Sequence, residues 1–437
     1  MRISRLTKAL AVGLLTVSLA GLSACGAGSR TGAQTAATVP CDFENPAQPT
    51  TVNVLAYNSS AVDPFTNTMV KNCTRDNVTV KHDPIDFGGQ VQKTVATLSG
   101  DKGSYDVIET YGYIIPTYAA QGSLQPLDDL YAKYKDKYKL GDINEDMRKA
   151  MSYDGKLYGL PMQAQVLVLA YRKDVFDKNG LEAPTTFEEM KAAAKKIQDS
   201  GDMKYPIALP WLATGDISTQ YQAALNSLGK DFVDPETKKP QFESPESKKA
   251  LEEMKGLLPY MDPQVTTFDQ PKVQQQMFNG TAAIAIMFSG RMNDLTLETN
   301  SKYFDKFAFA APPAVESGGS LFSRLSIDGW SIPANTKLDP DLLFQMIAAS
   351  VSEEASKASV PAAYPARKGA VTPDSSPYAQ AAIDSIAKTE APLTAPYVPD
   401  VSNAVISLVA QTVSGKLSID EGTAQMQAAA EKVMEKY

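Results

Sequence analysis

The sequence is poor in the residues that catalysis and metal binding use most. Its 437 residues include one histidine, three cysteines and two tryptophans. His82, the one histidine, lies in a strand-like stretch beside charged residues, and no local motif supports a Ser-His-Asp or Cys-His arrangement there. A Walker A sequence and a zinc-ligand spacing are also missing. We therefore expect a protein that is not an enzyme and that holds no metal and no cofactor.

Excess positive charge and long apolar runs are missing as well. Asp and Glu number 50 against 42 Lys and Arg, and the formal net charge is −8. Nucleic acid needs a basic surface, so this balance disfavours nucleic acid as a partner. Beyond the first 26 residues, no apolar stretch reaches the roughly 20 residues that span a bilayer.

The first residues have the layout of a secretory signal peptide. Arg2, Arg5 and Lys8 precede an apolar run, and residues 11–26 read AVGLLTVSLAGLSACG. The LSAC stretch resembles the lipobox of bacterial lipoproteins, in which the cysteine is lipidated and becomes the first residue of the mature chain. The alternative is an ordinary signal peptide with an incidental cysteine. We expect a lipoprotein signal peptide over residues 1–24 and a lipid on Cys25.

A tether and a disulfide are expected next. Residues 26–40 are small and polar without periodicity, so residues 25–50 are expected to form a flexible tether between the lipid and the folded body. Cys41 and Cys73 remain once Cys25 is assigned to the lipid. An even pair in an exported chain favours a disulfide over two free buried thiols.

Strand-like segments alternate with helical patterns in both halves of the chain. In the first half, β-branched stretches at 51–57, 78–85 and 105–110 are separated by amphipathic runs. The alternation resumes with apolar stretches at 165–171 and 205–211. This order predicts an α/β protein with mostly parallel sheets flanked by helices.

Aromatic residues gather where the predicted strands end. Tyr57, Tyr111, Tyr113, Trp211 and Trp330 all occupy such positions. Ligands of open parallel sheets bind outside the carboxyl ends of the strands, and a flat ring there can cover the C–H face of a sugar. The alternative is that each ring packs in the core. For the group, we favour a binding site.

Four longer segments, in the same order along the chain, resemble family 1 extracellular solute-binding proteins, the receptors of bacterial carbohydrate ABC importers. They are SYDVIETYGYIIPTYAAQGSLQPLDDL, GKLYGLPMQAQVLVLAYRKDVFDKNGLEAPTTFEEMKAAAKKI, FNGTAAIAIMFSG and IDGWSIPANTKLDPDLLFQMIAASVS. YPARKGAV matches a further element of the family. The resemblance implies a two-lobed, maltose-binding-protein-like fold of the periplasmic-binding class, with hinge crossings between lobes that close on ligand.

The resemblance and the strand-end pattern together give the candidate site. Gln165 stands where an acid is common in the family, and the tryptophan that often follows the FSG stretch is missing, which favours a monosaccharide or polyol as one possible ligand. The ligand-binding candidates are Tyr57, Asn58, Glu109, Tyr111, Gln163, Gln165, Trp211, Phe288, Ser289, Arg291, Asp328, Gly329, Trp330 and Arg367.

The sequence thus predicts a receptor on the outer face of the bacterial cytoplasmic membrane, held there by its lipid and monomeric. It would capture a carbohydrate and deliver it to the transmembrane permease subunits of an ABC importer. The expected lobes are residues 51–160 with 289–328, and residues 161–288 with 329–437. An iron or polyamine receptor of the same fold is an alternative, and an exported glycoside hydrolase, which needs two carboxyl groups about 5 to 10 Å apart, is an alternative of another class.

Overall fold

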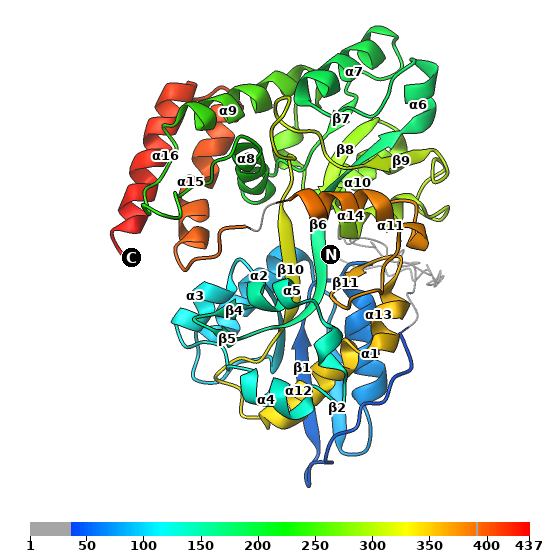
Figure 1. Ribbon diagram of the computed structural model, residues 1–437, viewed down its shortest axis with the longest axis vertical. Helices are drawn as coiled ribbons and strands as arrows, with labels where there is room; N and C mark the ends of the chain where they lie inside the picture. Colours follow the sequence, from blue (N-terminus) through cyan, green and yellow to red (C-terminus); the bar gives the residue numbers. More distant parts are fainter. Residues whose placement is uncertain (1–35, 390–391) are drawn as a thin grey trace, which may run out of the picture.

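The computed structural model describes residues 36–389 and 392–437. The predicted signal peptide and Cys25 lie outside the described residues. Two lobes lie one above the other in Figure 1, and long strands run between them. Of the helices in the described ranges, none is both long and apolar enough to cross a membrane.

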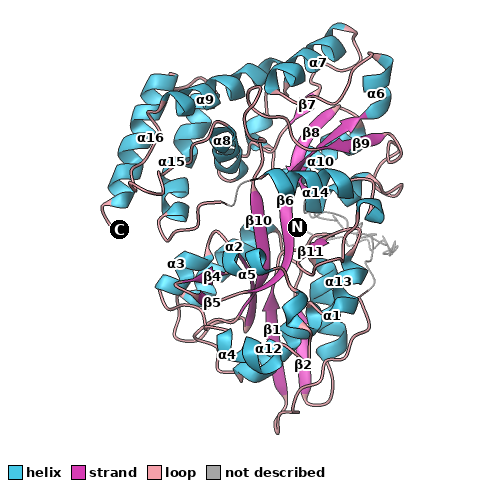
Figure 2. Cartoon of the chain, viewed as in Figure 1, coloured by secondary structure: helices cyan, strands magenta, loops and turns pink. Residues whose placement is uncertain are grey.

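The first lobe contains the N-terminal elements and a later helical segment that returns to it (Figure 2). Its elements are β1 (Thr50–Leu55), α1 (Asp63–Cys73), β2 (Val78–His82), α2 (Phe87–Leu98), β3 (Val107–Tyr111), α3 (Ile115–Ala120), α4 (Asp128–Tyr134), the 3-10 turn η1 (Leu140–Asp142), α5 (Glu145–Ala150), β4 (Ser152–Tyr153), β5 (Lys156–Leu157), α12 (Pro340–Ser350), α13 (Glu353–Ser359) and β11 (Tyr364–Pro365).

The second lobe contains the middle of the chain and the C-terminal helices. Its elements are α6 (Lys173–Lys178), α7 (Phe187–Asp199), β7 (Ile207–Ala208), α8 (Asp216–Ser227), α9 (Pro245–Leu257), η2 (Leu258–Tyr260), η3 (Val265–Thr267), α10 (Gln270–Asn279), β8 (Ile284–Phe288), η4 (Ser289–Arg291), α11 (Met292–Leu295), β9 (Phe307–Ala310), η5 (Pro373–Ser375), α14 (Ala379–Lys388), α15 (Val398–Val413) and α16 (Ile419–Met434).

Two strands, β6 (Leu160–Arg172) and β10 (Leu325–Ser331), join the lobes. The strand order is β2-β1-β3-β10-β6-β8-β7. β1 runs parallel to β2 and β3, and β7 runs parallel to β8, as the β-α alternation predicted. The crossing strands β6 and β10 run antiparallel to their neighbours, so parallel pairing is confined to the outer part of each lobe.

The helices begin at residues that satisfy their free backbone N–H groups. The Asp86 side chain accepts from Gly89 N at 2.6 Å at the start of α2, and Ser244 accepts from Ser247 N at 3.1 Å at the start of α9. Ser418 and Glu421 form a reciprocal capping box on α16. Local sequence therefore fixes where these helices enter the fold.

The lobe boundaries differ from those expected for the second half of the chain. One core cluster holds buried apolar residues from 39 to 164 and from 327 to 366, and the other holds those from 166 to 322 and from 378 to 433. Residues 289–322 therefore belong to the second lobe and residues 329–366 to the first, the reverse of the expected assignment. The reason is that the end of β10 pairs with β3, and α12 and α13 then pack against α1.

The N-terminal strap, residues 36–46, is part of the folded first lobe, which shortens the expected tether. Asn72 of α1 donates to Ala37 O at 2.8 Å and accepts from Val39 N at 3.1 Å. The Arg75 guanidinium lies over the Phe43 ring and donates to Phe43 O at 3.0 Å. The predicted disulfide is confirmed, since Cys41 in the strap is bonded to Cys73 at the end of α1.

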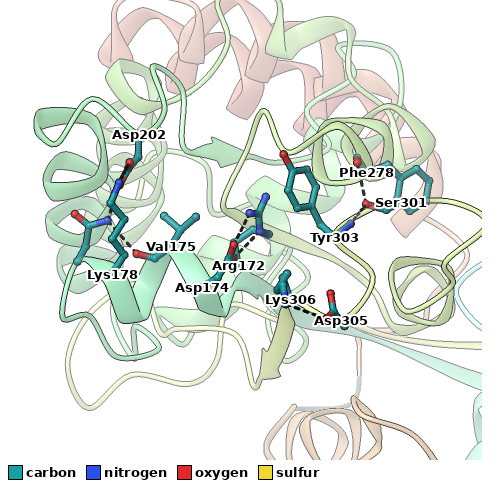
Figure 3. A network of polar contacts seen from close by, with 11 residues as sticks. Arg172, Asp174, Val175, Lys178, Asp202, Phe278, Ser301, Tyr303, Asp305 and Lys306 are labelled. Carbon is teal, nitrogen blue, oxygen red and sulfur yellow. Dashed lines mark hydrogen bonds and ion pairs between the residues drawn. The ribbon is translucent and has the colours of Figure 1, made fainter.

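The far end of β6 is fixed in the second lobe by a buried arginine (Figure 3). The Arg172 guanidinium donates to Asp174 at 2.7 and 2.8 Å and lies 3.7 Å from the centre of the Tyr303 ring. Gly280, which ends α10 with φ +68°, is required there because a Cβ would collide with Tyr303. This packing anchors the end of β6 in the second lobe.

Candidate functional site

The candidate site is built on the ends of three adjacent strands between the lobes. In the register of the sheet, Asp328 on β10 lies opposite Tyr111 on β3 and opposite Gln163 on β6. Ser326 and Gln165 form the next row. Directly opposed residues of antiparallel strands lie on one face with Cβ atoms about 5 Å apart, so the pairing gathers these polar side chains.

Asp328 is the centre of this polar group. Its Oδ2 accepts from Gln165 Nε2 at 2.7 Å and from Gln163 Nε2 at 3.2 Å, and its Oδ1 accepts from Ser326 Oγ at 3.1 Å. Burial raises the pKa of Asp328 to about 6, and the three hydrogen bonds oppose that rise. The carboxyl group is thus held in place as an acceptor.

Glu109 lies on β3, two residues before Tyr111, which pairs with Asp328, and is fully buried. Its Oε2 accepts from the Tyr57 backbone N–H at 3.1 Å, and within the described part of the chain its Oε1 has no hydrogen-bond partner. Burial, followed by the nearby Asp328 charge, raises the pKa of Glu109 well above its usual value. A neutral Glu109 carries a proton that it can donate to a hydroxyl oxygen.

A row of aromatic rings forms the first-lobe wall. The centres of Tyr57 and Phe87 lie 5.6 Å apart, those of Phe87 and Tyr111 5.6 Å apart, and those of Tyr111 and Tyr113 5.7 Å apart. The Tyr57 hydroxyl accepts from Gln165 Nε2 at 3.0 Å. The Tyr111 hydroxyl donates to Gln90 Oε1 at 3.1 Å, so both tyrosines are oriented by amide side chains.

The opposite wall comes from the second lobe at η4. Ser289 Oγ accepts from the Val166 backbone N–H at 3.3 Å, and Ser60 of the first lobe donates to Gly290 O at 3.4 Å. Burial, followed by the charges of Asp328 and Glu109, raises the pKa of Tyr57, and the positive charge of Arg291 opposes that rise. The two lobes therefore meet at η4.

Behind η4 the second lobe holds a buried carboxyl group. Gln270 accepts from the Phe288 backbone N–H at 3.2 Å and donates to Asp216 Oδ1 at 3.3 Å. Burial raises the pKa of Asp216 to about 6, with Arg291 among the opposing effects. The charge of Arg291 on η4 thus acts on Tyr57 of the first lobe and on Asp216 of the second.

Arg324, which is not among the predicted site residues, makes contacts in both lobes. Its guanidinium lies 5.6 Å from the centre of the Tyr113 ring in the first lobe and donates to Gln222 Oε1 on α8 in the second. Gln222 in turn donates to Asp231 at 2.6 Å. A small cavity of about 20 Å³ adjoins Arg324. In the sequence, the feature that could have indicated Arg324 is its position just before β10, four residues ahead of Asp328.

Most of the predicted site residues lie together between the lobes, and Asn58 lies beside them. Asn58 follows Tyr57 but uses its amide on both Asp63 oxygens at 2.8 Å. The residues brought together between the lobes are Tyr57, Glu109, Tyr111, Gln163, Gln165, Ser289, Arg291 and Asp328.

Four other predicted site residues make contacts that support the fold. Trp330 and Trp211 are fully buried in the cores of the first and second lobe. The Arg367 guanidinium donates to the backbone carbonyls of Val351, Lys139 and Tyr138 at 2.7 to 2.8 Å and so ties the first lobe together. Gly329 is needed because a Cβ would lie 2.6 Å from Leu160 O on the neighbouring strand.

No group of three or more His, Cys, Asp or Glu side chains that could hold a metal ion occurs in residues 36–389 and 392–437. The cleft groups are instead amides, carboxyl groups, guanidinium groups and rings. Such a set recognises hydroxyl groups, which donate and accept hydrogen bonds at once.

Comparisons with known proteins agree with this description. A mannitol-binding protein of Pseudomonas aeruginosa is 27% identical over 252 residues, which are 56% of this chain and 56% of that protein. The match thus spans little more than half the length of this relative.

Solved structures match over a larger part of the chain. An ABC transporter solute-binding protein from Agrobacterium vitis S4 with bound D-mannitol has a TM-score of 0.75 and 26% identity, covering 88% of this chain and 98% of that one. One from Agrobacterium radiobacter K84 in complex with ribitol has a TM-score of 0.79 at 20% identity, covering 90% and 100%, and supports the two-lobed fold alone.

The family assignment rests on the family model. The model of the bacterial extracellular solute-binding proteins matches residues 63–357. That range holds both crossing strands and the whole polar group around Asp328. The chain therefore belongs to the family of bacterial extracellular solute-binding proteins.

Proposed function

We propose that this protein is the receptor of an ABC importer and that it captures a polyol or small sugar between its lobes. The observation that carries the proposal is the buried group of Asp328, Gln163 and Gln165 beside Glu109, faced by η4 of the second lobe. The mannitol named for two of the similar proteins supports the same class of ligand.

The geometry fits vicinal hydroxyl groups. Asp328 and the tyrosine hydroxyls accept or orient hydrogen bonds, whereas Arg291, Arg324 and the glutamine amides donate them. The aromatic row offers apolar faces to C–H groups. A polyol presents both kinds of surface along one short chain.

Hinge closure is the mechanism that we propose for capture. Three described segments cross between the lobes: β6, β10 and the stretch between β11 and α14. A ligand that contacts Asp328 on one side and Arg291 on the other binds the closed form more tightly than the open form and shifts the population toward it. The permease of the importer would then bind the closed form.

The protein is proposed to act on the outer face of the cytoplasmic membrane, as a monomer held by a lipid on Cys25. The family description as extracellular supports export, and the LSAC stretch supports the lipid. Cys25→Ser is expected to release the protein into the medium or to leave its precursor uncleaved. A variant that stays on the membrane after normal processing would contradict the anchor.

The test of the ligand class is a thermal-shift screen of the mature chain followed by calorimetric titration. D-Mannitol, ribitol, D-tagatose and maltose form the panel, with spermidine and an aryl glycoside as probes of the alternatives. A true ligand at 100 times its Kd adds about 2.7 kcal/mol to stability.

The matched variants are Asp328→Asn in the site and Asp129→Asn on the exposed start of α4. We expect binding of a polyol or sugar to be lost in the first and kept in the second. Stabilisation by spermidine alone, or turnover of the glycoside, would instead support the polyamine receptor or the hydrolase.

A further inference from the structure

The N-terminal strap, residues 36–46, lies on the first lobe as an extended segment that belongs to no strand. Its side chains alternate, with Val39, Cys41 and Phe43 buried and the residues between them exposed. Such alternation is typical of an extended chain that lies on a surface. The strap is therefore bound in one direction and in one register.

Side chains of the first lobe bind the backbone of the strap along its length. The Thr68 hydroxyl of α1 accepts from Ala37 N at 3.0 Å, and Lys137 donates to Asp42 O at 2.6 Å. Other donors to carbonyl groups of the strap are Lys71, Asn72, Arg75, Asn77 and Tyr138. All of these side chains belong to the first lobe, so the strap is attached to that lobe and leaves the second lobe free to move.

The direction of the strap decides where the preceding chain leaves the lobe. β1 begins at Thr50, at the base of the first lobe in Figure 1 and about 23 Å along an extended chain from Tyr57 in the site. The strap runs back from this base along α1 to Thr68. Thr68 is about 8 Å along the helix axis from Asp63, where α1 begins. The exit of the chain is thereby moved toward residues 59–61, which contact η4 of the second lobe.

The strap also limits how far the lobe can lie from a lipid on Cys25. Residues 25–35 span at most about 40 Å when fully extended. A tether that ended at β1 would comprise residues 25–49 and would span at most about 90 Å. The bound strap thus halves the reach of the tether and fixes the side of the lobe from which it leaves.

We propose that the strap orients the receptor on its membrane, so that the α1 flank, formed by residues 36–46 and by Asp63–Cys73, faces the bilayer. The inference rests on the lipid on Cys25, which is part of the proposed function, and deepens it by naming the surface that lies next to the membrane. The contact of Ser60 with Gly290 O lies beside the start of α1. This edge of the cleft is then presented to a permease in the same membrane.

The experiment measures energy transfer from the purified lipoprotein to acceptor-labelled lipid in phosphatidylcholine vesicles. A donor dye is attached at Asn67→Cys on the α1 flank or at Lys156→Cys on β5, on the other side of the first lobe (Figure 1). Both positions are exposed, whereas Cys41 and Cys73 are buried in their disulfide and do not take the dye. We expect transfer to be more than about twofold higher from Asn67→Cys, because the tether leaves beside this residue and spans at most about 40 Å.

A second chain releases the strap by Cys41→Ser with Cys73→Ser. Residues 27–35 are deleted from this chain as well, so that the tether keeps about its length and only its exit moves to the base of the lobe. Hydrogen exchange of residues 36–46 checks the release, and Asn72→Ala with Arg75→Ala is added if the strap stays protected. The difference in transfer between the two dye positions should then disappear.

Calorimetric titration of every chain with D-mannitol is made alongside, and the Kd should stay that of the wild type because the strap lies outside the site. Equal transfer from both dye positions in the wild type would overturn the inference, and so would a preference for Asn67→Cys that persists after release of the strap. Neither result would affect the proposed ligand.

The proposed function is tested separately by the same samples. A wild-type chain that washes off the vesicles would refute the lipid on Cys25 and the inference with it. A chain that is oriented as expected but binds neither D-mannitol nor the other polyols and sugars of the panel would refute the proposed ligand class and leave the inference standing.

Discussion

At the scale of single residues, the cleft places acids where ionisation is unfavourable. Asp328 is buried between two glutamine amides, and its pKa is raised to about 6 chiefly by loss of hydration. Glu109 shares that burial and is affected by the Asp328 charge. Such groups lower the stability of the ligand-free protein at neutral pH, and acids with strongly shifted pKa values cluster at functional sites of proteins.

The pH dependence of stability follows from this raised pKa. Between about pH 4 and 6 the unfolded chain loses the Asp328 proton while the native protein keeps it, so the free energy of unfolding falls as pH rises through that window and then levels off. The full effect of Asp328 is roughly 3 kcal/mol.

Urea unfolding of ligand-free wild type and Asp328→Asn at pH 4 to 7 measures the effect. The free energy of unfolding of the variant should fall less between pH 4 and 6 than that of the wild type. Asp216, whose pKa is also raised to about 6, contributes the same fall in both proteins. Parallel curves for the two proteins would show that Asp328 is charged in the native state at low pH.

Trp330 is expected to behave as a core residue. It is fully buried and lies opposite Glu109 in the register, one row deeper than Asp328. Trp330→Phe should lower the free energy of unfolding of the ligand-free protein by about 1 to 3 kcal/mol.

Affinity for the ligand should change by less than about threefold, since the ring has no exposed surface. Denaturant unfolding and calorimetry give the two quantities. A large loss of affinity with unchanged stability would show that Trp330 contacts the ligand.

At the scale of elements, the strands of the candidate site can be predicted from the sequence. The direction in which each of their side chains points cannot be predicted as well. Asp328, Gln163 and Gln165 were predicted because their segments resemble a known family, and the register of β10 and β6 places them side by side. The burial of Trp330 in the first-lobe core could not be predicted, because its depth along β10 depends on pairing with β3 and β6. The contacts of Arg367 could not be predicted either, because its partners are backbone carbonyls, which leave no sequence signal.

The lobe boundaries and the position of the strap also could not be predicted from local sequence patterns. Local patterns give helices and strands, but the return of residues 329–366 to the first lobe is decided by packing of α12 and α13 on α1. The small polar residues before Cys41 have the composition of a tether, yet Lys71 and Asn72 of the first lobe donate to the backbone carbonyls of Ala36 and Ala37. Long-range contacts of this kind are not encoded in local composition.

The strap should depend on its disulfide. Cys41 and Cys73 are 32 residues apart, and opening a loop of that size removes about 3 to 4 kcal/mol of stability in the chain-entropy model. A double variant, Cys41→Ser with Cys73→Ser, should melt earlier, and amides of residues 36–46 should exchange faster with solvent.

Exchange in β3 and β6 should stay slow in that variant, because the polar group of the site makes no contact with the strap. Hydrogen exchange with mass spectrometry resolves the two regions. Equal protection of the strap in both proteins would mean that Arg75 and Asn72 hold it without the disulfide.

At the scale of the whole molecule, the lobes meet through a few specific contacts beside the site. Ser60 of the first lobe donates to Gly290 O of the second at 3.4 Å, and on the other side of the cleft Thr117 of α3 donates to Pro396 O at 3.0 Å. Arg324 links Tyr113 to α8 between them. Closure can therefore be changed at one of these contacts without touching either core.

Gly290 is the most direct place to do so. A Cβ at this position would lie 2.7 Å from Gln165 Oε1 and 2.9 Å from the Ala61 Cβ of the facing lobe. Gly290→Val should therefore hold the lobes apart and favour the open form. The expected result is a rise in Kd of about tenfold or more, since a ligand must then offset the bias against closure.

Small-angle scattering with saturating ligand should show a larger radius of gyration for Gly290→Val than for the wild type. Gly141→Val is the control, because a Cβ at Gly141 meets no atom within 4 Å. The ligand-free melting temperature should stay close to that of the wild type, because the added methyl groups point between the lobes. If Gly290→Val closes and binds as the wild type does, the contact of η4 with residues 60–61 is not part of the closed receptor.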